Sequence, residues 1–249
     1  MKQWLSFLTC ALLLFATAAT TNACVWGSFD ASRVNYSDGT LNGGAHSTLR
    51  GIITSNGGTI AAGTPTLTAE YLAGVDVFYT SLLNTSTGVL VESEQNALHD
   101  WIAAGGVLIV TADIFPLPAY ESFTAFYGVT GYDDLGDAGT GVPVADHPIT
   151  EGVATFYYNT QSTFTYGPDA LLLGVDGGGR DYMIVMEPGT GFDAGGRILV
   201  IGDHNGFTNS SIGEADNMVL VDNFVRWACT SLPNPVVETS WGKVKSMFQ

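Results

Sequence analysis

Blocks of apolar and polar residues follow one another along the chain and predict alternating strands and helices. Short apolar runs rich in β-branched residues are typical of buried strands, whereas apolar residues spaced three or four apart are typical of amphipathic helices. The predicted strands are 32–37, 59–62, 75–80, 107–111 and 197–201. The predicted helices are 45–56, 68–73, 93–104 and 119–127. Strands that are apolar throughout belong to sheets covered on both faces, so this order predicts a parallel sheet between two helical layers.

The stretch from Gly195 to Asn217 shows one strand–helix unit most clearly. An apolar run at 197–201 follows two glycines, and a polar loop comes directly after it. Asp216 and Asn217 then occupy the N-cap position of a helix. That helix would bury Leu220, Val221, Phe224, Val225 and Ala228. In open α/β sheets the loops of such units lie at the carboxyl edge, where ligands usually bind.

The pattern is looser between Ile114 and Gly167, which we expect to form loops and short strands at the rim of the sheet. After it, the apolar runs 171–175 and 181–186 are joined through glycines, which predicts an antiparallel pair. The expected fold class is therefore α/β. It is a three-layer flavodoxin-like sandwich with a mostly parallel sheet and an irregular β-rich rim insertion.

The first residues have the pattern of a secretory signal peptide. Lys2 precedes an apolar run from Leu5 to about Ala19, which is short for a transmembrane span. We place the cleavage after Ala23, with Ala19 as the second choice. The mature chain is then expected to be secreted, periplasmic or at the cell surface.

The chain divides into a signal peptide at 1–23, an α/β domain at 24–232, and a linker with a short tail at 233–249. A lipoprotein with an acylated Cys24 is the weaker alternative, because Thr21 stands where a Leu-like residue is expected. No apolar run after the signal peptide is long enough to cross a bilayer.

The composition indicates one large domain with an acidic surface. Apolar residues make up 46% of the 249 residues, which is enough for a sizeable core. The formal net charge is −16, and no Lys or Arg occurs between Arg50 and Arg180. Such a surface repels phosphate groups, so nucleic acid and anionic membranes are excluded as favoured partners. Cations, carbohydrates and envelope proteins remain candidate partners.

Three cysteines are present, and Cys10 would leave with the signal peptide. Cys24 and Cys229 then remain in an oxidising compartment, which predicts a disulfide between the two ends of the domain. Two free buried thiols are the alternative.

Three motifs, in this order, resemble the class I glutamine amidotransferase-like superfamily. They are Ala104-Gly-Gly-Val-Leu-Ile-Val, His147-Pro-Ile-Thr-Glu-Gly-Val, and Gly196-Arg-Ile-Leu-Val-Ile-Gly-Asp followed by Asp216-Asn217 and Phe224-Val-Arg-Trp. The resemblance covers about Arg33 to Ala228. It is strongest to the secreted and transporter-associated branch, which includes ThuA-like domains, and it implies a bacterial envelope protein of that fold.

The chain departs from the amidotransferases of this superfamily at the nucleophile. Those enzymes carry a Cys at a strand-to-helix elbow and a His paired with Glu near the C-terminus. No Cys lies between Cys24 and Cys229, and no Gly-x-Ser-x-Gly elbow replaces it. The strand that ends at Asp113 delivers a carboxylate, which cannot act as a thiolate does. We therefore expect no glutamine hydrolysis.

Asp38, Asp113 and Asp203 each follow a predicted parallel strand, so all three should reach the same edge of the sheet. Such a trio could hold a hard cation such as calcium, which prefers carboxylate and amide oxygens. Further candidate ligand-binding residues are Asn205, Asn209 and Asp216. The alternative is that each side chain caps a helix or fixes a turn.

His204 follows Asp203 in a loop and could serve as an acid, a base or a metal ligand. A hydrolase of carbohydrate or amide bonds would use Asp113, Asp203 and His204, with or without a divalent metal. The hypothesis we favour is a secreted or periplasmic, non-catalytic amidotransferase-like binding or accessory domain of the cell envelope. A purely structural surface protein is the third hypothesis.

Overall fold

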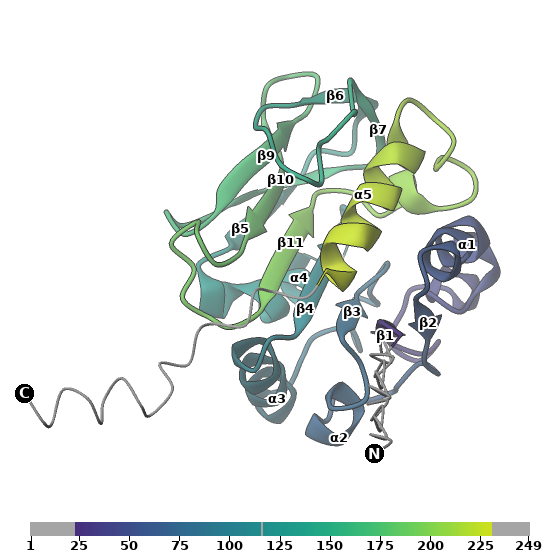
Figure 1. The fold of residues 1–249 in the computed structure, drawn as a ribbon, viewed down its shortest axis with the longest axis vertical. Coiled ribbons are helices and arrows are strands. Elements are labelled where there is room, and N and C mark those ends of the chain that lie inside the picture. Colours follow the sequence, from purple (N-terminus) through teal and green to yellow (C-terminus); the bar gives the residue numbers. More distant parts are fainter. Residues whose placement is uncertain (1–22, 116, 231–249) are drawn as a thin grey trace, which may run out of the picture.

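Nine strands form one mixed sheet in the computed structural model, which describes residues 23–115 and 117–230 (Figure 1). They are β1 (Val25–Ser28), β2 (Thr59–Ile60), β3 (Val77–Tyr79), β4 (Val107–Thr111), β6 (Ala138–Pro143), β7 (Phe156–Asn159), β9 (Leu171–Val175), β10 (Asp181–Met186) and β11 (Arg197–Ile201). Their order is β2-β1-β3-β4-β11-β10-β9-β6-β7. Residues 1–22 of the predicted signal peptide and the predicted tail at 233–249 lie outside the described residues.

The strands from β2 to β11 in this order run parallel, and the pairings beyond β11 are antiparallel. The parallel half has the flavodoxin-like order, in which the crevice lies at the carboxyl ends of β1 and β3, where the order reverses. The predicted antiparallel pair is confirmed as β9 and β10. The flavodoxin-like α/β class is therefore confirmed, with an antiparallel half added beside it.

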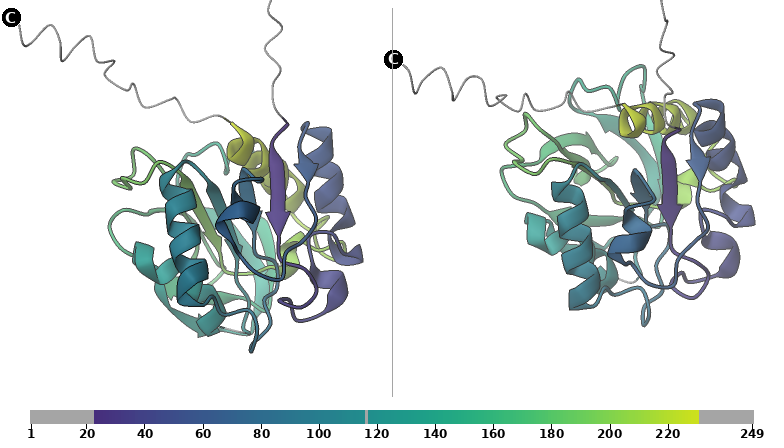
Figure 2. Two further views of the ribbon diagram at one scale, coloured as in Figure 1. Left: turned by 90° about the horizontal axis from the view of Figure 1, so that it is seen from below. Right: turned by 60° about the horizontal axis from the view of Figure 1, so that its bottom comes forward.

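Helices cover both faces of the sheet (Figures 1 and 2). Helices α1 (Ser47–Ser55) and α5 (Asn217–Cys229) contact each other on one face. On the other face lie α2 (Ala69–Leu72), α3 (Glu92–Ala103) and α4 (Leu117–Thr124). The short 3-10 helices are η1 (Ser37–Gly39), η2 (Gly44–His46), η3 (Ala125–Tyr127) and η4 (Asn205–Phe207).

Successive residues of the central strands pack into two separate cores. Tyr79, Ile109 and Ile201 belong to the core beneath α1 and α5, whereas their neighbours Phe78 and Val110 belong to the core beneath α2, α3 and α4. Both faces of the strands are thus buried, which explains why their sequences are apolar throughout.

The first strand lies nearer the N-terminus than predicted. Strand β1 is Val25–Ser28, whereas 32–37 is a connection in which Val34 makes an isolated antiparallel bridge to Leu83. Arg33 is buried there because its guanidinium pairs with another side chain, not because it faces a sheet. The strand prediction at 32–37 is therefore wrong, and Asp38 does not end a parallel strand.

Helix α3 begins at Glu92, one residue before its predicted start. The N-cap position belongs to Val91, and the Glu94 carboxylate accepts the Val91 N–H at 3.1 Å. The same carboxylate forms an ion pair with Arg33, 2.7 Å between Oε1 and Nη1. A buried acidic side chain in the first turn therefore caps the helix.

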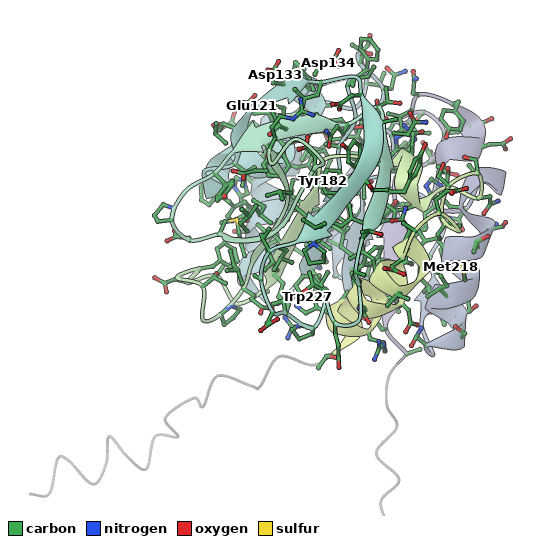
Figure 3. All side chains as sticks on the ribbon, turned by 90° about the horizontal axis from the view of Figure 1, so that it is seen from above. Glu121, Asp133, Asp134, Tyr182, Met218 and Trp227 are labelled. Atoms are coloured by element: carbon green, nitrogen blue, oxygen red, sulfur yellow. A yellow bond between two sulfur atoms is a disulfide. The ribbon has the colours of Figure 1, made fainter. Side chains whose placement is uncertain are left out.

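The irregular β-rich rim between 114 and 167 is confirmed. Within it, β5 (Thr130–Asp134) and β8 (Ser162–Thr165) form a separate antiparallel pair. Figure 3 shows Asp133 and Asp134 on the outer side of this pair, away from α5. The other two strands of the rim, β6 and β7, extend the main sheet.

Cys24 and Cys229 form the predicted disulfide, with their Cα atoms 5.6 Å apart. The indole Nε1 of Trp26 donates a hydrogen bond to Cys229 Sγ at 3.3 Å. The disulfide ties the start of β1 to the end of α5. It also engages the Cys24 sulfur, which argues against the acylated lipoprotein alternative. Within residues 23–115 and 117–230, no helix has the length and apolar composition that a membrane span requires.

Candidate ligand site at the carboxyl edge of the sheet

Asp113, Asp203 and His204 come together at the carboxyl ends of β4 and β11. Each offers a potential ligand atom within 4.8 Å of those of the other two. All three residues are buried, with 5%, 0% and 1% of their surface exposed, respectively. The strands pair in parallel with Thr111 opposite Ile201, and this register brings the residues that follow them side by side.

Asp113 orients the imidazole of His204. Its Oδ2 accepts hydrogen bonds from His204 Nδ1 at 2.7 Å and from Asn205 Nδ2 at 2.9 Å. With the proton on Nδ1, a neutral His204 has a free lone pair on Nε2. That Nε2 atom is buried and has no hydrogen-bond partner among the described residues. A carboxylate holds a general base or a metal-ligating histidine in this way.

Asp203 ties the loop after β11 to the end of β7. Its carboxylate accepts backbone N–H groups of Asn205 at 2.7 Å, Asn159 at 2.8 Å and Gly206 at 3.1 Å. Burial raises the pKa of the Asp203 carboxyl to about 6, and the charge of Asp113 acts in the same direction, while His204 and the N–H donors oppose the rise. Asn205 thus lies within the same group, as predicted.

Two hydroxyls from the neighbouring strands belong to the same place. Tyr79 ends β3 and Thr111 ends β4, and alternation along the strands directs both side chains to the face covered by α1 and α5. Burial raises the pKa of the Tyr79 phenol, and the adjacent Thr111 hydroxyl opposes the rise. Even so, neither oxygen has a partner at good hydrogen-bond geometry within the described chain.

His46 completes the group from the connection after β1. Its Nδ1 lies 3.2 Å from the Thr40 carbonyl oxygen, and its ring centroid is 5.8 Å from that of Tyr79. Burial, together with a smaller effect of the nearby His204, lowers the pKa of His46 to about 4, so the imidazole is neutral at pH 7. His46 was not predicted as a site residue, because it follows a glycine-rich turn and has no motif of its own.

We call Tyr79, Thr111, Asp113, Asp203, His204 and His46 the edge cluster. Six buried side-chain atoms in the described part of the chain lack a hydrogen-bond partner, and four of them belong to this cluster. They are Tyr79 Oη, Thr111 Oγ1, His46 Nε2 and His204 Nε2. Because native proteins satisfy nearly all buried polar atoms, this concentration makes the edge the candidate place for a bound water, ion or ligand.

Of three other predicted residues, Asn209 and Asp216 make turn-fixing contacts, and Asp38 lies apart from the site. Asp38 is exposed on η1 and, within the described residues, is not part of the group of adjacent ligand atoms. Asn209 Nδ2 donates to the Gly44 carbonyl oxygen at 2.7 Å. Asp216 Oδ2 accepts the Ala154 N–H at 2.9 Å, although Asp216 makes no side-chain cap to α5 in the described structure.

Backbone strain is found at the same edge. Of three non-glycine residues with positive φ among those described, Ser81 (57°) follows β3 and Thr160 (68°) follows β7. The Ser81 hydroxyl donates to the Gly39 carbonyl oxygen. Thr160 Oγ1 lies 3.5 Å from Asn205 Nδ2, beside Asp113. Strained residues of this kind cluster at ligand-binding sites.

His147 lies in a separate polar cluster. Its Nε2 donates to Glu187 Oε1 at 3.0 Å, and its Nδ1 accepts the Ile149 N–H at 3.1 Å. Glu187 Oε2 accepts the Trp227 indole N–H at 2.7 Å. An open groove of about 920 Å³, lined by residues between 143 and 153, adjoins this cluster. Both nitrogens of His147 are satisfied, which favours a structural role for this histidine.

No known family model matches the sequence, and no curated protein matches it either. Solved structures do have a similar fold. The N-terminal domain of mmIFT52 aligns with a TM-score of 0.62 and 16% identity over 84% of this chain and 98% of that one. The cytoplasmic protein STM1381 of Salmonella typhimurium LT2 aligns with a TM-score of 0.60 and 13% identity over 83% and 99%.

A Thermoplasma acidophilum protein named for GMP synthase aligns with a TM-score of 0.51 and 11% identity over 90% of this chain and 98% of that one. At these identities the comparisons show the fold alone. They are consistent with a class I glutamine amidotransferase-like fold, and the narrower ThuA-like assignment stays a prediction.

Proposed function

We propose that this chain is an extracytoplasmic, non-catalytic amidotransferase-like domain that binds a small polar ligand at the edge cluster, as a binding or accessory module of the cell envelope. The concentration of four buried polar atoms without partners in the described chain carries the proposal. It coincides with the edge of the parallel strands where flavodoxin-like sheets bind ligands. A ligand or its ordered waters would satisfy these atoms.

The compartment is supported by the disulfide between Cys24 and Cys229, since such bonds persist in oxidising environments. The fold by itself does not fix the compartment, because STM1381 is named a cytoplasmic protein. The non-catalytic role is supported by the sequence, which has no Cys between the two disulfide cysteines.

The charges of the edge cluster indicate which ligands suit it. Asp113 and Asp203 supply negative charge, and the buried imidazole of His46 is neutral at pH 7. An anion would meet repulsion there, whereas a cation or a neutral polyhydroxy compound finds acceptors and hydroxyls. Carbohydrates and cations are therefore the favoured ligand classes.

A thermal-shift screen tests the proposal. We expect at least one monosaccharide, disaccharide, amino-acid amide or metal chloride to raise the melting temperature, because a ligand of the native state stabilises it by mass action. Asp113→Asn should remove that shift. Asp133→Asn is the matched control, since Asp133 is exposed on the outer side of the rim (Figure 3), and it should keep the shift. A shift that survives Asp113→Asn would place the ligand elsewhere.

A hydrolase is the second candidate function, favoured by the 2.7 Å hydrogen bond between His204 and Asp113. An imidazole held in this way can remove a proton from an attacking water. Assays with nitrophenyl glycosides and amino-acid nitroanilides test it. Turnover that His204→Gln abolishes would favour the hydrolase, and turnover unchanged in that variant would exclude His204 as its base.

A further inference from the structure

Burial limits the size of the ligand that the edge cluster can hold. Asp113, Asp203 and His204 are at most 5% exposed. The hydroxyls of Tyr79 and Thr111 are buried as well and have no partner within the described chain, and the same holds for His204 Nε2. A single ion fits among such atoms, whereas a sugar ring requires an open pocket. Of the two favoured ligand classes, burial therefore selects the cation.

The two carboxylates of the edge cluster lack a basic partner. Asp113 pairs with His204 at 2.7 Å, whereas the arginines of residues 23–115 and 117–230 pair only with other carboxylates. Even a protonated His204 would balance one of the two negative charges. Buried carboxylates repel one another, and buried charges are ordinarily paired or bound to a metal. The charge that is missing beside Asp203 is therefore positive.

The spacing of Asp113, Asp203 and His204 suits one ion. Each offers one ligand atom, and the three atoms lie within 4.8 Å of one another. Bonds of about 2.0–2.2 Å from zinc to nitrogen or oxygen place two ligands of one ion up to about 4.4 Å apart, so only a small movement brings all three within reach. Each carboxylate also keeps a lone pair, because Asp203 Oδ1 accepts one N–H, from Asn205, and Asp113 Oδ1 accepts one, from Ile114.

We propose that Asp113, Asp203 and His204 bind one divalent transition-metal ion, through one oxygen of each carboxylate and one nitrogen of the imidazole. Imidazole nitrogen suits zinc and its neighbours in the first transition row, whereas calcium takes six to eight oxygens. The hydroxyls of Tyr79 and Thr111 would accept hydrogen bonds from waters that complete the coordination. The proposal rests on the proposed function, because it names the cation that this ligand site takes.

The calcium site predicted from Asp38, Asp113 and Asp203 is the competing outcome. Asp38 is exposed on η1, and His204 takes its place in the group of adjacent ligand atoms within the described chain. Because an imidazole ligand favours zinc over calcium, the relative affinity for the two metals distinguishes the two donor sets.

Calorimetric titration of the chelator-treated mature chain with zinc chloride and with calcium chloride tests the proposal. We expect one zinc ion per chain and a loss of affinity of at least about tenfold in each of Asp113→Asn, Asp203→Asn and His204→Gln. The matched controls are His99→Gln on α3 and Asp133→Asn on β5, and their zinc affinity should equal that of the wild type. Wild-type zinc affinity in any of the three edge variants, or calcium binding as tight as zinc binding, would overturn the proposal.

X-ray absorption at the zinc edge of the wild-type chain gives an answer even if the buried variants do not fold. One imidazole among oxygen ligands is expected. A shell of oxygen atoms alone, or one with two or more imidazoles, would overturn the proposal.

The thermal-shift screen separates failure of the metal site from failure of the proposed function. A chain that binds no zinc but shows an Asp113-dependent shift with a carbohydrate would refute the metal site and retain the proposed function. A chain that responds to no metal salt and to no organic compound would refute both. An Asp113-dependent shift with zinc chloride, and none with any organic compound, would support the metal as the ligand itself.

Discussion

The guanidinium of Arg33 and the carboxylate of Glu94 form a buried ion pair, with 2.7 Å between Nη1 and Oε1. The pair joins the connection after β1 to the first turn of α3. Glu94 Oε1 also accepts the Leu67 N–H at 2.9 Å, and the guanidinium lies 4.3 Å above the ring of Phe29. The connection that carries His46 to the edge cluster is therefore anchored at its start by one charged side chain.

Glu94→Gln should destabilise the protein most at neutral pH. Burial alone would raise the pKa of Glu94, but Arg33 and the N–H groups of Leu67 and Val91 more than offset it, so the pKa lies below its ordinary value of 4.5. A carboxyl whose pKa is lowered by folding contributes stability above its unfolded pKa, and this is lost as the pH falls through the folded pKa. Removing one partner of a buried pair costs about 3 kcal/mol.

Urea denaturation of the wild type and of Glu94→Gln at several pH values measures the difference between their free energies of unfolding. The difference should shrink as the pH falls from 4.5 through the lower pKa of the folded state, because the wild-type carboxylate then becomes protonated as well. Glu92→Gln, an exposed residue of the same helical turn, is the control and should change stability little. A difference that stays constant with pH would show that the ion pair contributes no net stability.

The disulfide should contribute a large part of the stability of the domain. It closes a loop of 205 residues between Cys24 and Cys229, which in the chain-entropy model corresponds to about 5 kcal/mol. In chemical denaturation, the free energy of unfolding of the double variant Cys24→Ser, Cys229→Ser should be lower by that amount. A reducing agent should have the same effect on the wild type and none on the variant. Two free thiols in the secreted protein, found by non-reducing mass spectrometry, would contradict the pairing.

The correctly predicted elements are those whose sequence shows both a clear hydrophobic pattern and residues that end the element. Strand β4 is buried at every position and apolar at all but its last, Thr111, because both of its faces are covered, and glycines at 105 and 106 end the helix before it. Strand β1 has four residues after the predicted signal peptide and no clear period, so its place went unrecognised. Residues 32–37 form a connection instead, and Arg33 is buried there because it pairs with Glu94 of a helix that is distant in sequence.

The candidate site was predictable as far as it depends on strand ends. Asp113 and Asp203 follow apolar runs directly, and parallel neighbours bring such residues together. His46 was not predictable, because its position depends on how the connection after β1 folds back over β3. Tyr79 could not be recognised as a site residue for another reason. A tyrosine at the end of a strand has the same sequence pattern as an aromatic residue of the core.

Deleting residues 236–249 should barely change the melting temperature. These residues lie outside the described part of the chain, and the described helix α5 already ends at Cys229 with its disulfide. The tail holds Trp241, Val244 and Phe248 at spacing that could form one apolar helical stripe, together with two lysines. Differential scanning calorimetry of the truncated chain checks the prediction. A drop of many degrees would show that the tail packs on the domain, whereas a changed cellular location would show a targeting role.

Thr160→Gly should stabilise the protein. Thr160 is β-branched and has φ of 68°, a left-handed conformation that costs about 1–2 kcal/mol in a residue with a Cβ. Glycine removes this strain and loses about 0.5–1 kcal/mol through the greater freedom of its unfolded chain. The net gain in unfolding free energy should be about 0.5–1 kcal/mol, measured by urea denaturation.

Comparison with Ala215→Gly shows whether the backbone strain at Thr160 contributes to ligand binding. Ala215 has φ of 46° and forms a bridge with Phe156, at the opposite end of β7 from Thr160. Both variants should gain stability, but Thr160→Gly alone removes the hydroxyl beside Asn205 and loosens the loop next to Asp113. We therefore expect a smaller thermal shift from the ligand of the edge cluster in Thr160→Gly and an unchanged shift in Ala215→Gly. An equal shift in both variants would show that the strain at Thr160 belongs to the turn and not to the edge cluster.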